Sequence, residues 1–138
     1  MEIIKDNETL HINGLYLAAL VRYTDGTEKI IIDDRFDKLP KLVKTFIVLH
    51  EMGHRNGQVV ETVADSYAIS KLGKTRTWIA MLYLYHMFLK LDWTVSAQYL
   101  VRAYDAGLKM VKYMHVTSPN GKRWGVDDIR PLNTDNHI

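Results

Sequence analysis

Short apolar pieces alternate with polar clusters over the first 36 residues, and this pattern predicts β-strands. The pieces occupy residues 3–4, 10–12, 15–23 and 28–33. The polar cluster at residues 6–9 is typical of a turn, and Asp25-Gly26 is typical of a two-stranded hairpin. Residues 15–20 would also suit a helix on propensity alone. We expect a small antiparallel sheet at the N-terminus.

After this predicted sheet the apolar positions change to helical spacing. Residues 42–49 form an apolar run, for which Asp37 is the expected N-cap and Pro40 the expected first-turn residue. Asn56-Gly57 supplies the residue types that end a helix in a left-handed turn. A second amphipathic helix is therefore expected to begin near Val59.

Two more helices are expected in the second half of the chain. Residues 77–91 are apolar on every side but shorter than the roughly 18 to 20 residues of a membrane span. This favours a central buried helix, with His86 as a hydrogen-bonded core histidine. A last helix, capped by Asp92 or Thr94, carries an apolar stripe at helical spacing. The stripe comprises Ala97, Leu100, Tyr104, Leu108 and Val111.

The end of the chain has a different composition. Residues 116–138 combine turn-forming residue types with no periodicity, so we expect an irregular tail that Trp124 and Ile129 hold to the body. Residues 1–115 are expected to form a single domain, because 138 residues with 47% apolar content suffice for one core. The expected class is α+β, with the small sheet packed on a helical bundle.

Charge and composition exclude several classes of partner and site. Eighteen basic and sixteen acidic residues give a net charge of +2 without a long basic run, so neither nucleic acid nor a membrane is an expected partner. The chain has no cysteine, which excludes thiolate metal sites and leaves His, Asp and Glu as ligands. The first residues lack the pattern of a secretory signal, so a cytoplasmic location is expected.

The chemistry of this chain is concentrated in His50-Glu51-Met52-Gly53-His54, at the end of the first apolar helical run. Two histidines four positions apart lie on one face of a helix, so their ring nitrogens can converge on a single metal ion. Glu51 points about 100° further around the helix, where a carboxylate can take a proton from a metal-bound water. The pattern therefore predicts His50 and His54 as ligands and Glu51 as general base.

A metal site of this kind needs at least three protein ligands, and Glu61 is the nearest downstream carboxylate that could lie on a separate helix. Asp65 follows four residues later on the same face, where it could accept the second N–H of a ligand histidine. Without the upstream motif, Glu61 and Asp65 would be interpreted as part of an ordinary solvated helix face.

The sequence His50-Glu51-x-x-His54 followed by Glu61-Thr-Val-Ala-Asp65-Ser-Tyr-Ala resembles the gluzincin zinc metallopeptidases. It is most similar to the minigluzincins and the small phage or bacterial peptidases, over about residues 28–70. The resemblance implies a zincin-like fold, zinc held by His50, His54 and Glu61, Glu51 as general base, and Asp65 supporting a ligand histidine. The gap of six residues between His54 and Glu61 is shorter than in many relatives.

These observations lead to two hypotheses of different kinds. The first is a zinc-dependent metallopeptidase, an endopeptidase rather than an exopeptidase, that acts on a peptide or protein substrate. An edge strand near the metal could pair with the backbone of an extended substrate, although a plain scaffold sheet fits the sequence equally well. The alternative is a catalytically silent zincin-fold module that binds or regulates a protein partner. The sequence specifies neither the oxyanion-stabilising residue nor the oligomeric state.

Overall fold

The computed structural model describes residues 1–130 and has the expected α+β architecture. The chain divides into two compact units, residues 1–73 and residues 74–138. Each unit is described by itself below. The division falls inside the stretch for which the sequence suggested one domain, directly after the helix that carries Glu61 and Asp65.

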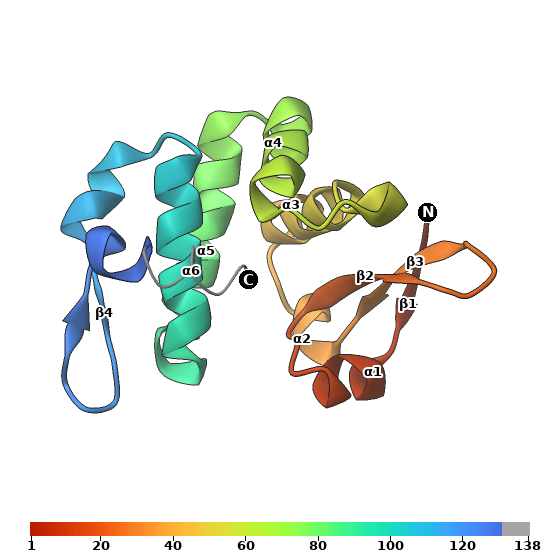
Figure 1. Ribbon diagram of the computed structural model, residues 1–138, viewed down its shortest axis with the longest axis horizontal. Helices are drawn as coiled ribbons and strands as arrows, with labels where there is room; N and C mark the ends of the chain where they lie inside the picture. Colours follow the sequence, from red (N-terminus) through yellow and green to blue (C-terminus); the bar gives the residue numbers. More distant parts are fainter. Residues whose placement is uncertain (131–138) are drawn as a thin grey trace. The chain divides into compact units, whose positions relative to one another are not determined.

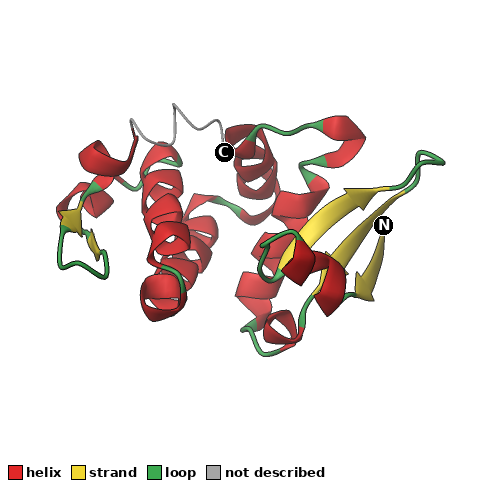
Figure 2. Ribbon diagram, turned by 60° about the horizontal axis from the view of Figure 1, so that its bottom comes forward, coloured by secondary structure: helices red, strands yellow, loops and turns green. Residues whose placement is uncertain are grey.

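The first unit opens on a three-stranded sheet formed by β1 (Glu2–Lys5), β2 (Ala18–Arg22) and β3 (Glu28–Ile32), in the order β1-β3-β2 (Figure 2). The predicted hairpin is confirmed, because β2 and β3 pair antiparallel on either side of Asp25-Gly26. β1, however, runs parallel to β3. The sheet is therefore mixed rather than purely antiparallel, and β2 is one of its two edge strands.

The parallel pairing of β1 follows from a helix where the sequence pattern predicted a turn and a strand. Residues 7–12 form α1 (Asn7–Ile12), because the Asp6 carboxylate accepts a hydrogen bond from the Thr9 N–H and caps the first turn. Glu8 adds a negative charge at the positive end of the helix. Leu10 is buried and Ile12 is exposed, as expected of a short amphipathic helix.

Two helices lead from the sheet to the motif. α2 (Asp34–Asp37) is followed by α3 (Lys41–Met52), which buries Val43, Phe46, Ile47 and His50. Asp37 is not the N-cap of α3, as predicted, but the last residue of α2, where its carboxylate pairs with Lys5. Pro40 takes the N-cap position of α3 instead, without a side-chain hydrogen bond.

The chain then reverses through a short 3-10 turn, η1 (Arg55–Gly57), and enters α4 (Glu61–Leu72). Asn56 and Gly57 both have positive φ angles, of 62° and 79°, so the predicted left-handed turn is confirmed. α4 packs against α3, as Figure 1 shows, and α3 also packs against β2. This arrangement brings the end of one helix, the start of the next and a strand edge to the same place.

The second unit is built on two long helices, α5 (Lys74–Leu91) and α6 (Trp93–Asp105), with Asp92 capping α6 as predicted. η2 (Lys109–Tyr113) follows α6. The described part of the segment expected to be an irregular tail, residues 116–130, has regular structure and begins with the strand pair β4 (Val116–Thr117) and β5 (Arg123–Trp124). Residues 126–130 are helical. Ile129 is buried and Trp124 stacks on Trp93, so both residues do hold this segment in place. Residues 131–138 lie outside the described part of the chain.

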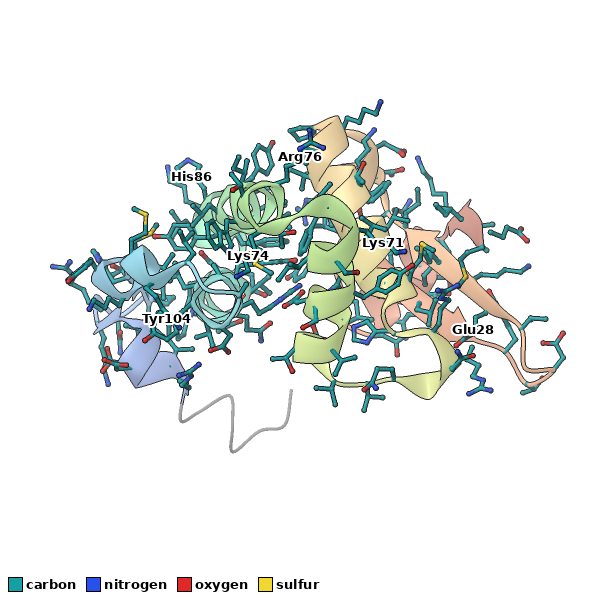
Figure 3. All side chains as sticks on the ribbon, turned by 90° about the horizontal axis from the view of Figure 1, so that it is seen from above. Glu28, Lys71, Lys74, Arg76, His86 and Tyr104 are labelled. Atoms are coloured by element: carbon teal, nitrogen blue, oxygen red, sulfur yellow. The ribbon has the colours of Figure 1, made fainter. Side chains whose placement is uncertain are left out.

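α5 differs from the prediction of a helix buried on every side. Its buried residues are Thr77, Ala80, Met81, Leu84 and Phe88, which form one face. His86 lies on the outer face and is exposed, so it is not the predicted core histidine (Figure 3). α6 ends at Asp105, which leaves Leu108 and Val111 beyond the helix. Within residues 1–130, the helices are too short or too polar to cross a membrane.

Candidate metal centre

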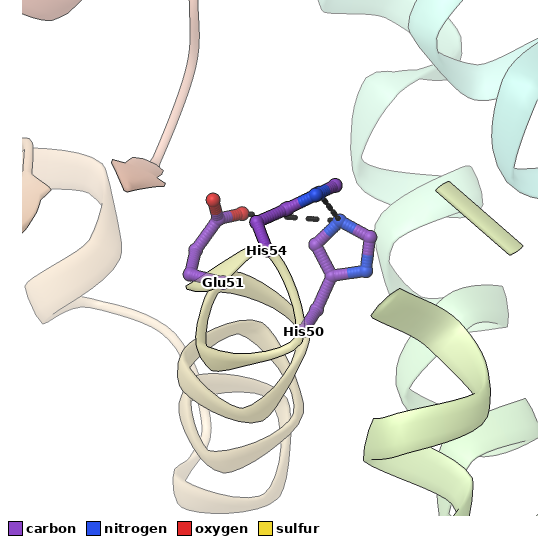
Figure 4. Close-up of side chains that lie close together, drawn as sticks. All are labelled: His50, Glu51 and His54. Carbon is purple, nitrogen blue, oxygen red and sulfur yellow. Dashed lines mark hydrogen bonds and ion pairs between the residues drawn. The ribbon is translucent and has the colours of Figure 1, made fainter. Parts of the chain in front are cut away.

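The two motif histidines meet at the end of α3. His50 lies in the last turn of α3 and is buried. His54 follows in the next turn of the chain, and its backbone N–H donates a hydrogen bond to the Glu51 carbonyl. Their Nε2 atoms are 3.1 Å apart and their rings are nearly perpendicular, at 85° (Figure 4). The helical spacing of the motif thus brings both Nε2 atoms to one point, as predicted from the sequence.

The orientation of both rings is fixed through the opposite nitrogen. His50 Nδ1 lies 2.7 Å from Asp65 Oδ1, and both side chains are buried. His54 Nδ1 lies 2.8 Å from the Gln58 carbonyl oxygen. Both acceptors take a proton from Nδ1, which selects the tautomer that leaves Nε2 as a metal ligand. The predicted partnership of Asp65 with a histidine is present in the structure.

Glu61, the first residue of α4, reaches both imidazoles. Its Oε1 lies 3.0 Å from His54 Nε2 and its Oε2 lies 3.2 Å from His50 Nε2. The Glu61 side chain is 38% exposed, whereas those of His50 and His54 are 7% and 15% exposed. The centre is therefore open to solvent on the side of Glu61.

These distances fit a tetrahedral metal site. Metal–ligand bonds of about 2.0 to 2.2 Å place neighbouring ligand atoms of a tetrahedron roughly 3.3 to 3.6 Å apart. The two Nε2 atoms are 3.1 Å apart, and each lies within 3.0 to 3.2 Å of one oxygen of the Glu61 carboxylate, Oε1 for His54 and Oε2 for His50, so each of these contacts is within a few tenths of an ångström of that spacing. The His50, Glu51 and His54 group could also hold a metal ion, since its ligand atoms all lie within 4.8 Å of one another.

Glu51 differs from Glu61 in its contacts. Its Oε2 is 3.9 Å from His50 Nε2, and its Oε1 accepts a hydrogen bond of 3.0 Å from the Leu20 N–H of β2. One oxygen is thus engaged by the strand edge while the other faces the imidazoles. The geometry favours Glu61 over Glu51 as the third ligand and leaves Glu51 beside the metal position.

The close approach of α3 and α4 depends on Gly53. A Cβ atom at this position would lie 2.6 Å from Ala64 Cα and 2.9 Å from the Ala64 carbonyl oxygen, closer than real Cβ atoms come. Ala64 lies on α4 between Glu61 and Asp65, so the glycine sets the distance of both carboxylates from the histidines. Gly53 was not among the residues predicted from the sequence to shape the site, although its place inside the motif was a visible signal.

The short connection between His54 and Glu61 does return the second helix to the histidines. The left-handed residues Asn56 and Gly57 reverse the chain, and the Asn56 N–H bonds to the Glu28 carboxylate at the start of β3. Gln58 then offers its carbonyl to His54 and its side-chain oxygen to the Val60 N–H. The six-residue gap is therefore long enough to bring Glu61 to the histidines.

Comparisons with protein-family models, curated proteins and solved structures find no match for this chain. The centre is accordingly interpreted from its own geometry.

The electrostatics of the centre follow from the contact between His54 and Glu61. The Glu61 carboxylate raises the pKa of His54 to about 9, with a smaller contribution from the Gln58 carbonyl, while burial acts in the opposite direction. A metal ion that binds at neutral pH must therefore displace a proton from His54. Burial raises the pKa of Glu51, and the two imidazoles and the Leu20 N–H partly oppose this.

Substitution of Gly53 by alanine is expected to weaken metal binding at least about tenfold, because the two helices must separate to admit the methyl group. The affinity for a divalent metal can be measured by calorimetry. Gly125→Ala is the matched control, since a Cβ there meets nothing closer than 3.7 Å. Unchanged affinity in Gly53→Ala would show that the helix contact does not control the site.

In the metal-free protein, an NMR titration of His54 is expected to give a pKa of about 9 that falls toward 6.5 in Glu61→Gln. The contact between His54 and Glu61 contributes fully to the stability of the fold below pH 6.5. This contribution is lost as the pH rises through 9, because the raised pKa of His54 belongs to the folded state. The exposed Glu8→Gln serves as control. A His54 pKa that is the same in Glu61→Gln as in the native chain would contradict the observed pairing.

Proposed function

We propose that this chain is a zinc-dependent metallopeptidase, of the gluzincin kind that its motif resembles, and that it cleaves within peptide or protein substrates. The proposal depends mainly on one observation. Three side chains, from α3, from the turn that follows it and from α4, converge through His50 Nε2, His54 Nε2 and the Glu61 carboxylate, while a second carboxylate lies beside them.

The donor set supports zinc as the metal. Two neutral imidazoles and one carboxylate are a common protein ligand set of catalytic zinc sites, which keep a fourth position open. A purely structural zinc site would carry a fourth protein ligand and would have no use for Glu51. The exposed side chain of Glu61 leaves room for a substrate on that side of the centre.

The chemistry divides between the metal and the chain. A bound zinc ion supplies a Lewis acid that polarises the substrate carbonyl and lowers the pKa of water to about 7. Glu51 accepts a proton from the attacking water as the new C–O bond forms. It then delivers that proton to the amide nitrogen as the C–N bond breaks, which releases an amine and a carboxylic acid. Asp65 and the Gln58 carbonyl hold the two imidazoles in the tautomer that binds metal.

The sheet offers a way to hold an extended substrate. β2 is an edge strand that packs on α3, and its Leu20 reaches Glu51 directly. A peptide that added to this edge would run past the general base, with its backbone held by main-chain hydrogen bonds. This supports an endopeptidase, because such pairing needs residues on both sides of the cleaved bond.

We expect the purified chain to bind one zinc ion, and His50→Ala, His54→Ala or Glu61→Ala to lower the affinity at least about a hundredfold. Asp65→Ala is expected to lower it about 10- to 100-fold. His86→Ala, an exposed histidine of the second unit, is the control and should have no effect. If Glu51→Gln abolished binding while Glu61→Gln did not, the roles of the two glutamates would be reversed.

The zinc-loaded chain is expected to cleave members of a proteome-derived peptide library, and Glu51→Gln is expected to slow cleavage about 10²- to 10⁴-fold with zinc retained. Peptide fragments can be quantified by mass spectrometry. Equal inactivity of the native chain and of Glu51→Gln, both with zinc bound, would instead support the alternative of a silent binding or regulatory module.

A further inference from the structure

The hydrogen bond from the Leu20 N–H to Glu51 Oε1 joins the sheet to the motif helix across 31 positions of sequence. It measures 3.0 Å. The Glu51 side chain is only 13% exposed, so little water reaches the carboxylate to compete for this bond. The Leu20 backbone is therefore a direct partner of the proposed general base.

The pairing register shows why this N–H is available. Tyr23 donates its N–H to the Thr27 carbonyl, and the Leu17 carbonyl accepts from Asp33, so the odd-numbered residues of this segment bond toward β3. Backbone groups alternate in direction along a strand, so those of Leu20 and Arg22 point off the open edge. The Leu20 N–H takes no part in the sheet itself.

The two oxygens of Glu51 have different surroundings. Oε1 is held by Leu20, and Oε2 lies 3.9 Å from His50 Nε2. A carboxylate fixed at one oxygen cannot turn its plane freely, so the other oxygen keeps its aim at the space beside the imidazoles. A carboxylate that takes a proton from water must keep its orientation toward that water, because a small displacement of the catalytic group lowers the reaction rate strongly.

We infer that the Leu20 N–H is a positioning group for Glu51: it holds Oε1 at the edge of β2 so that Oε2 faces the reacting water. This inference rests on the proposed hydrolytic function. It makes the edge of the sheet part of the proton-transfer machinery, because the position of the base relative to the metal ligands depends on where β2 lies. Any shift of β2 along α3 would move Oε1 and turn the carboxylate.

The backbone donor can be removed by Leu20→Pro. Proline is tolerated on an edge strand where the N–H faces outward, so the ladder with β3 keeps its hydrogen bonds. The matched control is Ile3→Pro on β1, the other edge strand of the sheet. Asp6 donates its N–H to the Ile32 carbonyl, so the even-numbered residues of this segment bond toward β3 and the N–H of Ile3 points off the opposite edge. With zinc content unchanged, we expect Leu20→Pro to lower kcat at least about tenfold with little change in KM. The Ile3→Pro control should keep kcat within about threefold of the native value.

A second measurement does not require activity. Amide hydrogen exchange at Leu20 is expected to be slow in the native chain and at least about tenfold faster in Glu51→Ala, while Arg22 is expected to exchange at the same rate in both. Equal Leu20 exchange in the two proteins would overturn the hydrogen bond, even if Leu20→Pro failed to fold. Native kcat in a folded, zinc-loaded Leu20→Pro would overturn the positioning role. An inactive native chain would overturn the proposed function, and the catalytic role of Leu20 with it. The exchange measurement would then still test whether the hydrogen bond between the Leu20 N–H and Glu51 exists.

Discussion

The candidate centre depends on the contact between the end of α3 and the first turns of α4, where no side chain separates the two backbones. Gly53 permits this approach to Ala64. Because Glu61 and Asp65 lie on either side of Ala64, one contact places both carboxylates against the histidine pair. Had the helices been held apart by a side chain, the same sequence motif would have left the two imidazoles without the Glu61 carboxylate.

Each remaining group of the centre is held by something outside the motif. Asp65 fixes the ring of His50, the Gln58 carbonyl fixes that of His54, and the Leu20 N–H engages Glu51. These partners come from α4, from the turn between the helices and from the sheet edge. The atoms proposed to bind the metal are therefore held in place by hydrogen bonds to other atoms of the same side chains, which is the arrangement expected of a preorganised site.

Much of the site could be predicted because its chemistry lies in side chains with fixed spacing. The convergence of the two histidines and the place of Glu51 beside them follow from helix geometry, and the left-handed turn follows from Asn56-Gly57. Glu61 and Asp65 could be proposed only together with the upstream motif. What could not be predicted is the contribution of backbone groups. The Leu20 N–H and the Gln58 carbonyl are chemically the same in every residue, so only the fold reveals which ones face the centre.

The errors in the fold have similar physical causes. Asp6 caps a short helix where a polar turn was expected, and that helix lets β1 return parallel to β3. Asp37 has the residue type of an N-cap, but a separate short helix intervenes before α3. His86 was assigned to the core because its neighbours are apolar, yet α5 buries one face and leaves His86 on the other. For Asp6 and Asp37 a local helix cap, made by Asp6 in α1 and by Asp33 in α2, decided between structures that the sequence allowed, whereas for His86 tertiary packing did.

If the centre binds metal as proposed, both histidines present Nε2 to one metal ion while Nδ1 stays protonated and hydrogen-bonded. Long-range ¹H–¹⁵N correlation spectra of the zinc-loaded protein test this directly, because they distinguish the two ring nitrogens of each histidine. We expect His50 and His54 to show a protonated Nδ1 and a metal-bound Nε2. Coordination of either ring through Nδ1, or spectra that do not change when zinc is added, would contradict the claim.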